Sequence, residues 1–150
     1  MLATIAGGEK IRVPLGRGGP EMTSEDGVQI NTASLTLTPE KKIVYVFEFT
    51  DRRSRALSGV RVEDVSDTTA APLVDDVQPK LSAAGRWHGE APPLDLSDSR
   101  LGWIATISNS LRVVRFTLTF SDGHTLVLHQ GGLYGAAMKA AVRQSFGQNY

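Results

Sequence analysis

Apolar and polar residues alternate between Val113 and His129, and this alternation predicts a β-hairpin. Apolar side chains occupy the even positions from Val114 to Phe120, while mostly polar residues occupy the odd ones, as in a strand with one buried face. Leu126 and Leu128 resume the alternation in a second strand. The hairpin indicates a mostly antiparallel β protein.

The turn of this hairpin can have either of two loop lengths. A two-residue loop of Asp122 and Gly123 would send the leucines of the second strand to the polar face. A three-residue loop over 121–123 pairs Leu118 with Leu126 and keeps the apolar faces together. It also puts Gly123 at the left-handed position of a type I turn followed by a G1 bulge. The sequence therefore predicts the bulged turn.

A second hairpin is predicted upstream, where Ile43 to Thr50 alternates in the same way. Pairing Leu37 with Ile43, and Leu35 with Tyr45, keeps the apolar residues on one face across a five-residue loop. Further alternations predict strands at Ile11 to Leu15, Ser58 to Val65, Trp103 to Ile107 and, more weakly, Pro72 to Leu81.

A helical period replaces the two-residue period over 133–146, after a predicted break at Gly131-Gly132. Tyr134 and Met138 fall on its apolar side. An isolated helix of this length is marginal in water, so it is expected to dock. It either covers the outer sheet faces of its own subunit, at Val44, Val46 and Val113, or contacts a second subunit.

Seven or eight short strands and one C-terminal helix predict an antiparallel β-sandwich of the immunoglobulin-like type, with a partly open barrel as the alternative. The 150 residues are expected to form a single domain, in which 1–10 and 16–27 are loops or flexible segments. The chain has no cysteine, so the inter-sheet disulfide of antibody domains is impossible and the likeness is one of architecture.

Composition narrows the classes of partner. Sixteen basic residues balance sixteen acidic ones, which argues against general binding to nucleic acid. No apolar run approaches the roughly 20 residues of a membrane span. The start of the chain lacks the pattern of a signal peptide. We expect a cytoplasmic protein, or a periplasmic one if the N-terminus has been trimmed.

Residues that could carry catalysis or bind a metal do not form a recognisable motif. His88, His124 and His129 lack the spacing of zinc ligands. The acidic pair Asp75-Asp76 and the loop 95–98 offer oxygen atoms for calcium, but without the spacing of an EF-hand. Serine occurs without the Gly-x-Ser-x-Gly elbow of hydrolases. The sequence predicts no catalytic residue, no cofactor and no metal.

Two segments could instead bind a partner. Arg52, Arg53 and Arg55 form a basic turn that could hold a phosphate or an acidic protein; the alternative is a solvated loop. Trp87 and His88 lie in a stretch expected to be irregular. The indole there could stack on a sugar or anchor a partner, or else cap one end of the sandwich.

These observations predict a non-catalytic protein-interaction or assembly module, whose partner is another protein or a second copy of the chain. A small-ligand or carbohydrate-binding domain, using Trp87 and the acidic loops, is the alternative. The residues expected to contact a partner or ligand are Trp87, His88, Arg52, Arg53, Arg55, Tyr134 and Met138.

Overall fold

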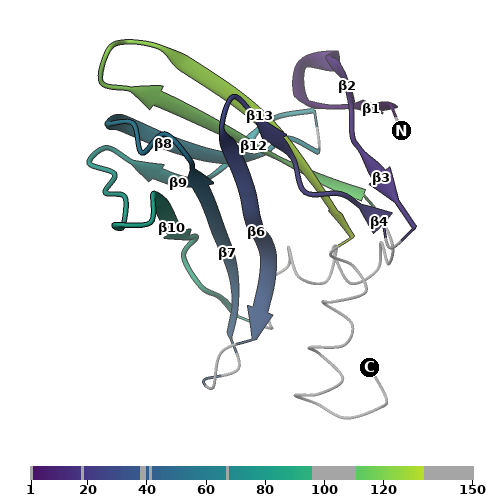
Figure 1. Ribbon diagram of the computed structural model, residues 1–150. Coiled ribbons are helices and arrows are strands. Elements are labelled where there is room, and N and C mark those ends of the chain that lie inside the picture. Colours follow the sequence, from purple (N-terminus) through teal and green to yellow (C-terminus); the bar gives the residue numbers. More distant parts are fainter. Residues whose placement is uncertain are drawn as a thin grey trace.

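The computed structural model describes residues 2–17, 19–37, 40, 42–66, 68–95 and 111–133. The described residues are mostly β and form antiparallel sheets (Figure 1). The predicted helix, with Tyr134 and Met138, and the predicted strand from Trp103 to Ile107 lie outside the described residues.

Two large antiparallel sheets make up most of the fold (Figure 1). The first has the strand order β10-β7-β6-β5, with β11 also paired to β7. Its strands are β5 (Ser24–Glu25), β6 (Val28–Leu37), β7 (Lys42–Asp51), β10 (Arg86–Glu90) and β11 (Leu94–Asp95). The second has the order β13-β12-β8-β9. Its strands are β8 (Leu57–Asp64), β9 (Ala71–Asp76), β12 (Leu111–Phe120) and β13 (Thr125–Leu133).

The inner faces of the two sheets share one hydrophobic core. Phe47 of the first sheet meets Phe116 of the second edge to face, with 5.8 Å between ring centroids, and both are fully buried. Phe116 and Phe120 point into this core, while Thr117 and Thr119 between them stay partly exposed. The two-residue period therefore predicts burial correctly from Val114 to Phe120.

The bulged turn predicted between β12 and β13 is confirmed. Leu118 pairs with Leu126, and Gly123 has a φ of 91°, while Asp122 is not among the residues with positive φ. The Gly123 N–H donates to the Phe120 carbonyl at 2.9 Å, which closes the type I turn. A turn of this type puts the leucines of β13 on the core side.

The upstream hairpin is confirmed in its register, since Leu37 pairs with Ile43 and Leu35 with Tyr45. A bulge interrupts β6 between Ile30 and Thr32. Because the bulge inserts one extra residue, Ile30 and Ala33 both face the core despite their opposite parity.

The predicted break at Gly131-Gly132 is wrong. Both glycines continue β13, where Gly131 pairs with Val113, and the strand runs on to Leu133, the first residue expected in the helix. Glycine weakens a strand but does not end it, and the ladder with β12 supplies the hydrogen bonds that keep this one extended.

The N-terminal segment contains more regular structure than its expected loops. Strand β1 (Leu2–Thr4) pairs with β2 (Lys10–Arg12) around a 3-10 turn, η1 (Ala6–Gly8). Strand β3 (Leu15–Gly16) pairs with β4 (Gly19–Pro20) beside β13 (Figure 1). These ladders have two or three pairs each, too few to leave an alternation in the sequence.

A second, smaller hydrophobic cluster lies on the outer face of the second sheet. Ile5 and Val13 from the N-terminal segment pack there with Val65 and Val113, and all four are buried. The outer face at Val113, which the predicted helix was expected to cover, is therefore occupied by the N-terminal segment.

Candidate functional site

The basic turn after β7 is organised around a buried carboxylate. Asp51 is fully buried and accepts hydrogen bonds from the backbone N–H of Arg53 at 3.1 Å and of Arg55 at 3.0 Å. The Arg55 Nε also donates to it, at 3.1 Å. Burial alone would raise the pKa of Asp51, but these hydrogen bonds outweigh burial and hold the pKa below its ordinary value.

A second carboxylate forms salt bridges with two arginines of this turn. Asp26, between β5 and β6, forms salt bridges of 3.1 Å with Arg53 and 3.0 Å with Arg55. Its hydrogen bond from Arg55 is the main reason that its pKa is lowered. The Arg55 guanidinium also lies 4.3 Å from the centroid of the Phe120 ring. Arg53 and Arg55 are thus paired within the chain, although Arg53 is exposed, as is Arg52.

A glycine allows the β9–β10 connection to join the same cluster. Gly85 has a φ of 75°, and its carbonyl accepts from the Asp51 N–H at 2.8 Å. A Cβ at this position would lie 2.4 Å from the Asp51 carbonyl oxygen. The turns after β5, β7 and β12 and the connection before β10 therefore meet at Asp51 and Arg55, which identifies the basic turn as a structural junction.

Trp87 belongs to the core. Its side chain stacks on Phe49 with 5.2 Å between centroids, and only 1% of the residue is exposed. The indole Nε1 donates to Asp76 Oδ2 at 3.0 Å, which links β10 to β9 in the other sheet. The indole therefore offers no free face for a sugar and packs between the two sheets.

The strand that carries Trp87 was expected to be irregular, and its side chains explain why. In β10 the inward positions are Trp87 and Gly89, and the outward ones are charged or polar. The Trp87 ring covers Gly89, since a Cβ there would lie 2.3 Å from the ring. One large residue fills the space of two, so the apolar alternation does not appear in the sequence.

His88 lies on the outer face of the first sheet, with half of its side chain exposed. Its Nε2 lies 3.1 Å from Glu90 Oε1, and its Nδ1 lies 3.7 Å from Glu48 Oε2. Arg86 binds the same Glu48 at 3.1 Å. Within the described ranges, no three His, Cys, Asp or Glu side chains are grouped so as to hold a metal ion. His88 is therefore part of a polar network on the surface.

Sequence reasoning missed a buried ion pair between the C-terminal end of β8 and the N-terminal end of β12. Arg112 Nη2 lies 3.0 Å from Asp64 Oδ2, and both residues are 8% exposed. Burial, followed by the charge of Asp64, raises the pKa of the nearby Tyr45. A signal existed, because Asp64 and Arg112 share the parity of the inward valines Val62 and Val114.

Gln130 was also missed, although it shares the inward parity of Leu128. It is 1% exposed, and its Oε1 accepts from the Thr23 N–H at 2.8 Å. Its Nε2 donates to the Glu21 carbonyl at 3.0 Å, and Thr23 Oγ1 donates to the His129 carbonyl at 2.6 Å. These bonds fix the segment before β5 along β13.

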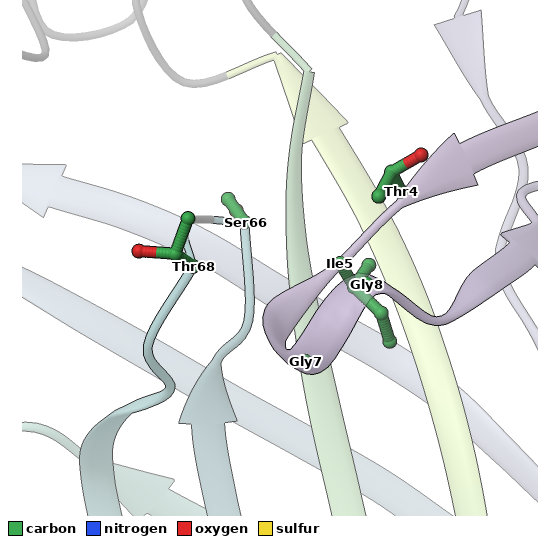
Figure 2. Close-up of a pocket in the computed structure, with 6 residues that line it drawn as sticks. All are labelled: Thr4, Ile5, Gly7, Gly8, Ser66 and Thr68. Atoms are coloured by element: carbon green, nitrogen blue, oxygen red, sulfur yellow. The ribbon is translucent and has the colours of Figure 1, made fainter.

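One pocket of about 580 Å³ lies between the N-terminal turn and the β8–β9 connection, lined by Thr4, Ile5, Gly7, Gly8, Ser66 and Thr68 (Figure 2). None of these residues is ionisable. The hydroxyls of Thr4 and Thr68 point away from the gap between the two segments (Figure 2). The backbone N–H groups from Ile5 to Gly8 all donate to carbonyls of the chain, so they form no anion-binding nest. The pocket offers neither acid–base chemistry nor a site for an anion.

Several large apolar side chains outside this pocket are exposed to solvent. Leu2, Leu15 and Met22 of the N-terminal segment and Val127 of β13 are 41–66% exposed, and we call these four residues the N-terminal surface. Within the described ranges, Val77, after β9, is a further large apolar residue that is exposed, at 72%.

Comparison of the chain with protein-family models, with curated proteins and with solved structures gives no match. Among the described residues, none forms a helix with the length and apolar character needed to cross a membrane.

Proposed function

We propose that this chain is a non-catalytic protein-interaction or assembly module built on an immunoglobulin-like sandwich. The partner is another protein or a second copy of the chain, and it binds at the N-terminal surface.

The connectivity of the two large sheets supports the immunoglobulin-like assignment. If the seven longer strands are lettered in chain order as A, B, C, C′, E, F and G, the first sheet contains E-B-A and the second contains G-F-C-C′. Immunoglobulin-type domains have these neighbours, with A, B and E in one sheet and C, F and G in the other. The shared aromatic core supports the same assignment.

The observation that carries the function is the exposure of four large apolar side chains on the N-terminal segment and on β13, the residues of the N-terminal surface. Leu15 belongs to the short β3–β4 ladder beside β13, Met22 follows β4, and Val127 lies on β13 itself. Apolar patches exposed on soluble domains mark contacts with other proteins, and methionine is enriched in such interfaces. The alternative of a carbohydrate-binding domain is less well supported, because Trp87 is buried and cannot stack on a sugar.

The test compares partner capture by three versions of the full chain carrying an affinity tag. The double variant Leu15→Ser/Met22→Ser makes the proposed surface polar, and Val77→Ser removes a more exposed apolar residue elsewhere. All three are produced in the source cell, captured, and analysed by quantitative mass spectrometry and by sedimentation.

We expect the wild type and Val77→Ser to retain the same partner or the same dimer. In the double variant we expect at least about a tenfold loss, which corresponds to about 1.4 kcal/mol of binding free energy. Equal capture by the double variant, or neither a partner nor a dimer for the wild type, would contradict the proposal.

A further inference from the structure

Strand β13 forms one edge of the second sheet, and the first part of that edge is open (Figure 1). The strand pairs with β12 on one side, and no described strand pairs with it on the other. Farther along, the Thr23 hydroxyl donates to the His129 carbonyl at 2.6 Å, so the segment before β5 covers the edge there. Thr125 is exposed and Val127 is 41% exposed. The open part of the edge therefore runs from Thr125 to Leu128.

The β12–β13 turn determines which backbone groups of this edge point outward. The Phe120 N–H donates to the His124 carbonyl at 2.8 Å, so these two residues form a hydrogen-bonded pair of the hairpin. Bonded and non-bonded pairs alternate along an antiparallel ladder, which puts Thr125 and Val127 in non-bonded pairs with β12. Their N–H and C=O groups therefore point away from β12. The carbonyl of His129, at the same parity, agrees with this, since it accepts its hydrogen bond from outside the ladder.

The outward backbone groups of the open stretch are available to another strand. Within the described ranges, no residue hydrogen-bonds to the backbone of Thr125 or Val127. The open stretch contains neither proline nor a charged residue. The opposite edge of the same sheet, β9, contains Pro72 and ends at Asp76. Proline and charge protect an edge strand against pairing, so the edge of β13 lacks the protection that β9 has.

We propose that two copies of the chain pair through this edge, with their β13 strands antiparallel about a two-fold axis at Leu126. In this register Thr125 of one copy lies opposite Val127 of the other, and each such pair exchanges two N–H···O=C hydrogen bonds. The second sheets of the two copies then form one continuous sheet. The inference rests on the proposed function, because Val127 belongs to the N-terminal surface, and it narrows the partner to a second copy.

A second copy fits the short open stretch because its own strand is equally short at this point. The other copy's β13 begins at Thr125, opposite Val127, and its turn follows at once, so the pairing stops before the position where Thr23 is bonded to His129. A strand that continued past this point would meet the segment before β5. The paired positions carry no charge, so two identical edges meet without repulsion between like charges.

Amide hydrogen exchange of the full chain at two protein concentrations tests the pairing. Between about 10 μM and about 1 mM, we expect exchange at Thr125 and Val127 to slow severalfold, because mass action favours the dimer. The amides of Leu126 and Leu128 belong to bonded pairs with β12 and should exchange slowly at both concentrations. This alternation of protection along β13 is specific to pairing at the edge.

Sedimentation of two variants at position 127 separates the backbone from the side chain. Val127→Pro removes the outward N–H, which the ladder with β12 does not use, and should weaken the dimer by at least about tenfold. Val127→Thr keeps that N–H and should dimerise within about threefold of the wild type. Should circular dichroism show that Val127→Pro is unfolded, Thr125→Lys takes its place with the same expectation, because a lysine on an edge strand opposes pairing.

Exchange at Thr125 and Val127 that is independent of concentration would overturn the pairing, as would a proline or lysine variant that dimerises like the wild type. Protection that appears only in an extract of the source cell would identify another protein on this edge and overturn the choice of a second copy. If Leu15→Ser/Met22→Ser loses its partner while the two amides stay unprotected, the proposed function stands and the pairing fails. Protected amides with unchanged capture by that double variant would support the pairing and contradict the proposed function.

Discussion

Replacing Asp51 by alanine tests the junction of loops at one end of the fold. The substitution removes a fully buried carboxylate and leaves the backbone N–H groups of Arg53 and Arg55 without their acceptor. Hydrogen bonds to a charged group contribute about 1.5 kcal/mol each, so these two give a loss of about 3 kcal/mol. The bond from the Arg55 side chain adds less, since Arg55 is partly exposed and retains Asp26.

Urea denaturation followed by circular dichroism measures this loss. With a slope of about 2 kcal/mol per molar urea, a loss of about 3 kcal/mol lowers the midpoint by about 1.5 M. Asp51→Asn keeps one acceptor oxygen and should lie between alanine and the wild type. Asp26→Asn, at a more exposed position in the same cluster, should have a smaller effect. A midpoint for Asp51→Ala no lower than that of Asp26→Asn would refute the reasoning.

Three further predictions concern other contacts. Gly89→Ala places a Cβ against the buried Trp87 ring and should cost about 1–3 kcal/mol in thermal unfolding, and a melting temperature unchanged from the wild type would contradict this. Gln130→Ala should speed amide hydrogen exchange at Thr23, whose N–H loses its acceptor. An unchanged rate at Thr23 would show that the Gln130 side chain does not fix the segment before β5. Because the pKa of Asp51 is lowered on folding, its contribution to stability is present above the unfolded pKa of about 3.9 and is lost as the pH falls through the folded pKa. The acid unfolding curve of Asp51→Asn should accordingly lack part of this dependence, and a curve parallel to that of the wild type would contradict it.

The local β structure was predictable wherever each inward position of a strand carried its own apolar side chain. From Val114 to Phe120 of β12, and at Leu126 and Leu128 of β13, the inward residues are apolar, and the bulged turn followed from keeping these two apolar faces together. The same reasoning gave the register of Leu37 with Ile43. These predictions needed only the geometry of a strand with one buried face.

The prediction failed for strands in which apolar and polar residues do not alternate. The strand around Trp87 was missed because its ring also covers Gly89, and the end of β13 was missed because paired glycines resemble a break. The N-terminal ladders are too short to leave a period. An alternation of apolar and polar residues shows none of these three features.

The sequence identified residues of the candidate site but not the contacts between them. The basic turn was found, but the sequence does not show that Asp26, which lies far from it in the chain, binds Arg53 and Arg55. The buried pair of Asp64 and Arg112 was visible as charges on inward positions of their strands. Charged residues at apolar parity are therefore the signal to search for in similar sequences.

Hydroxyl-radical footprinting of the wild-type chain tests most directly whether the N-terminal surface binds a protein. Side-chain oxidation is measured in the purified protein and in the concentrated extract of the source cell, and each rate is divided by that of Val77. We predict that the oxidation of Met22 and Leu15 falls severalfold in the extract, because a partner covers these exposed side chains. Equal relative oxidation of both residues under the two conditions would contradict the assignment of this surface as a binding site.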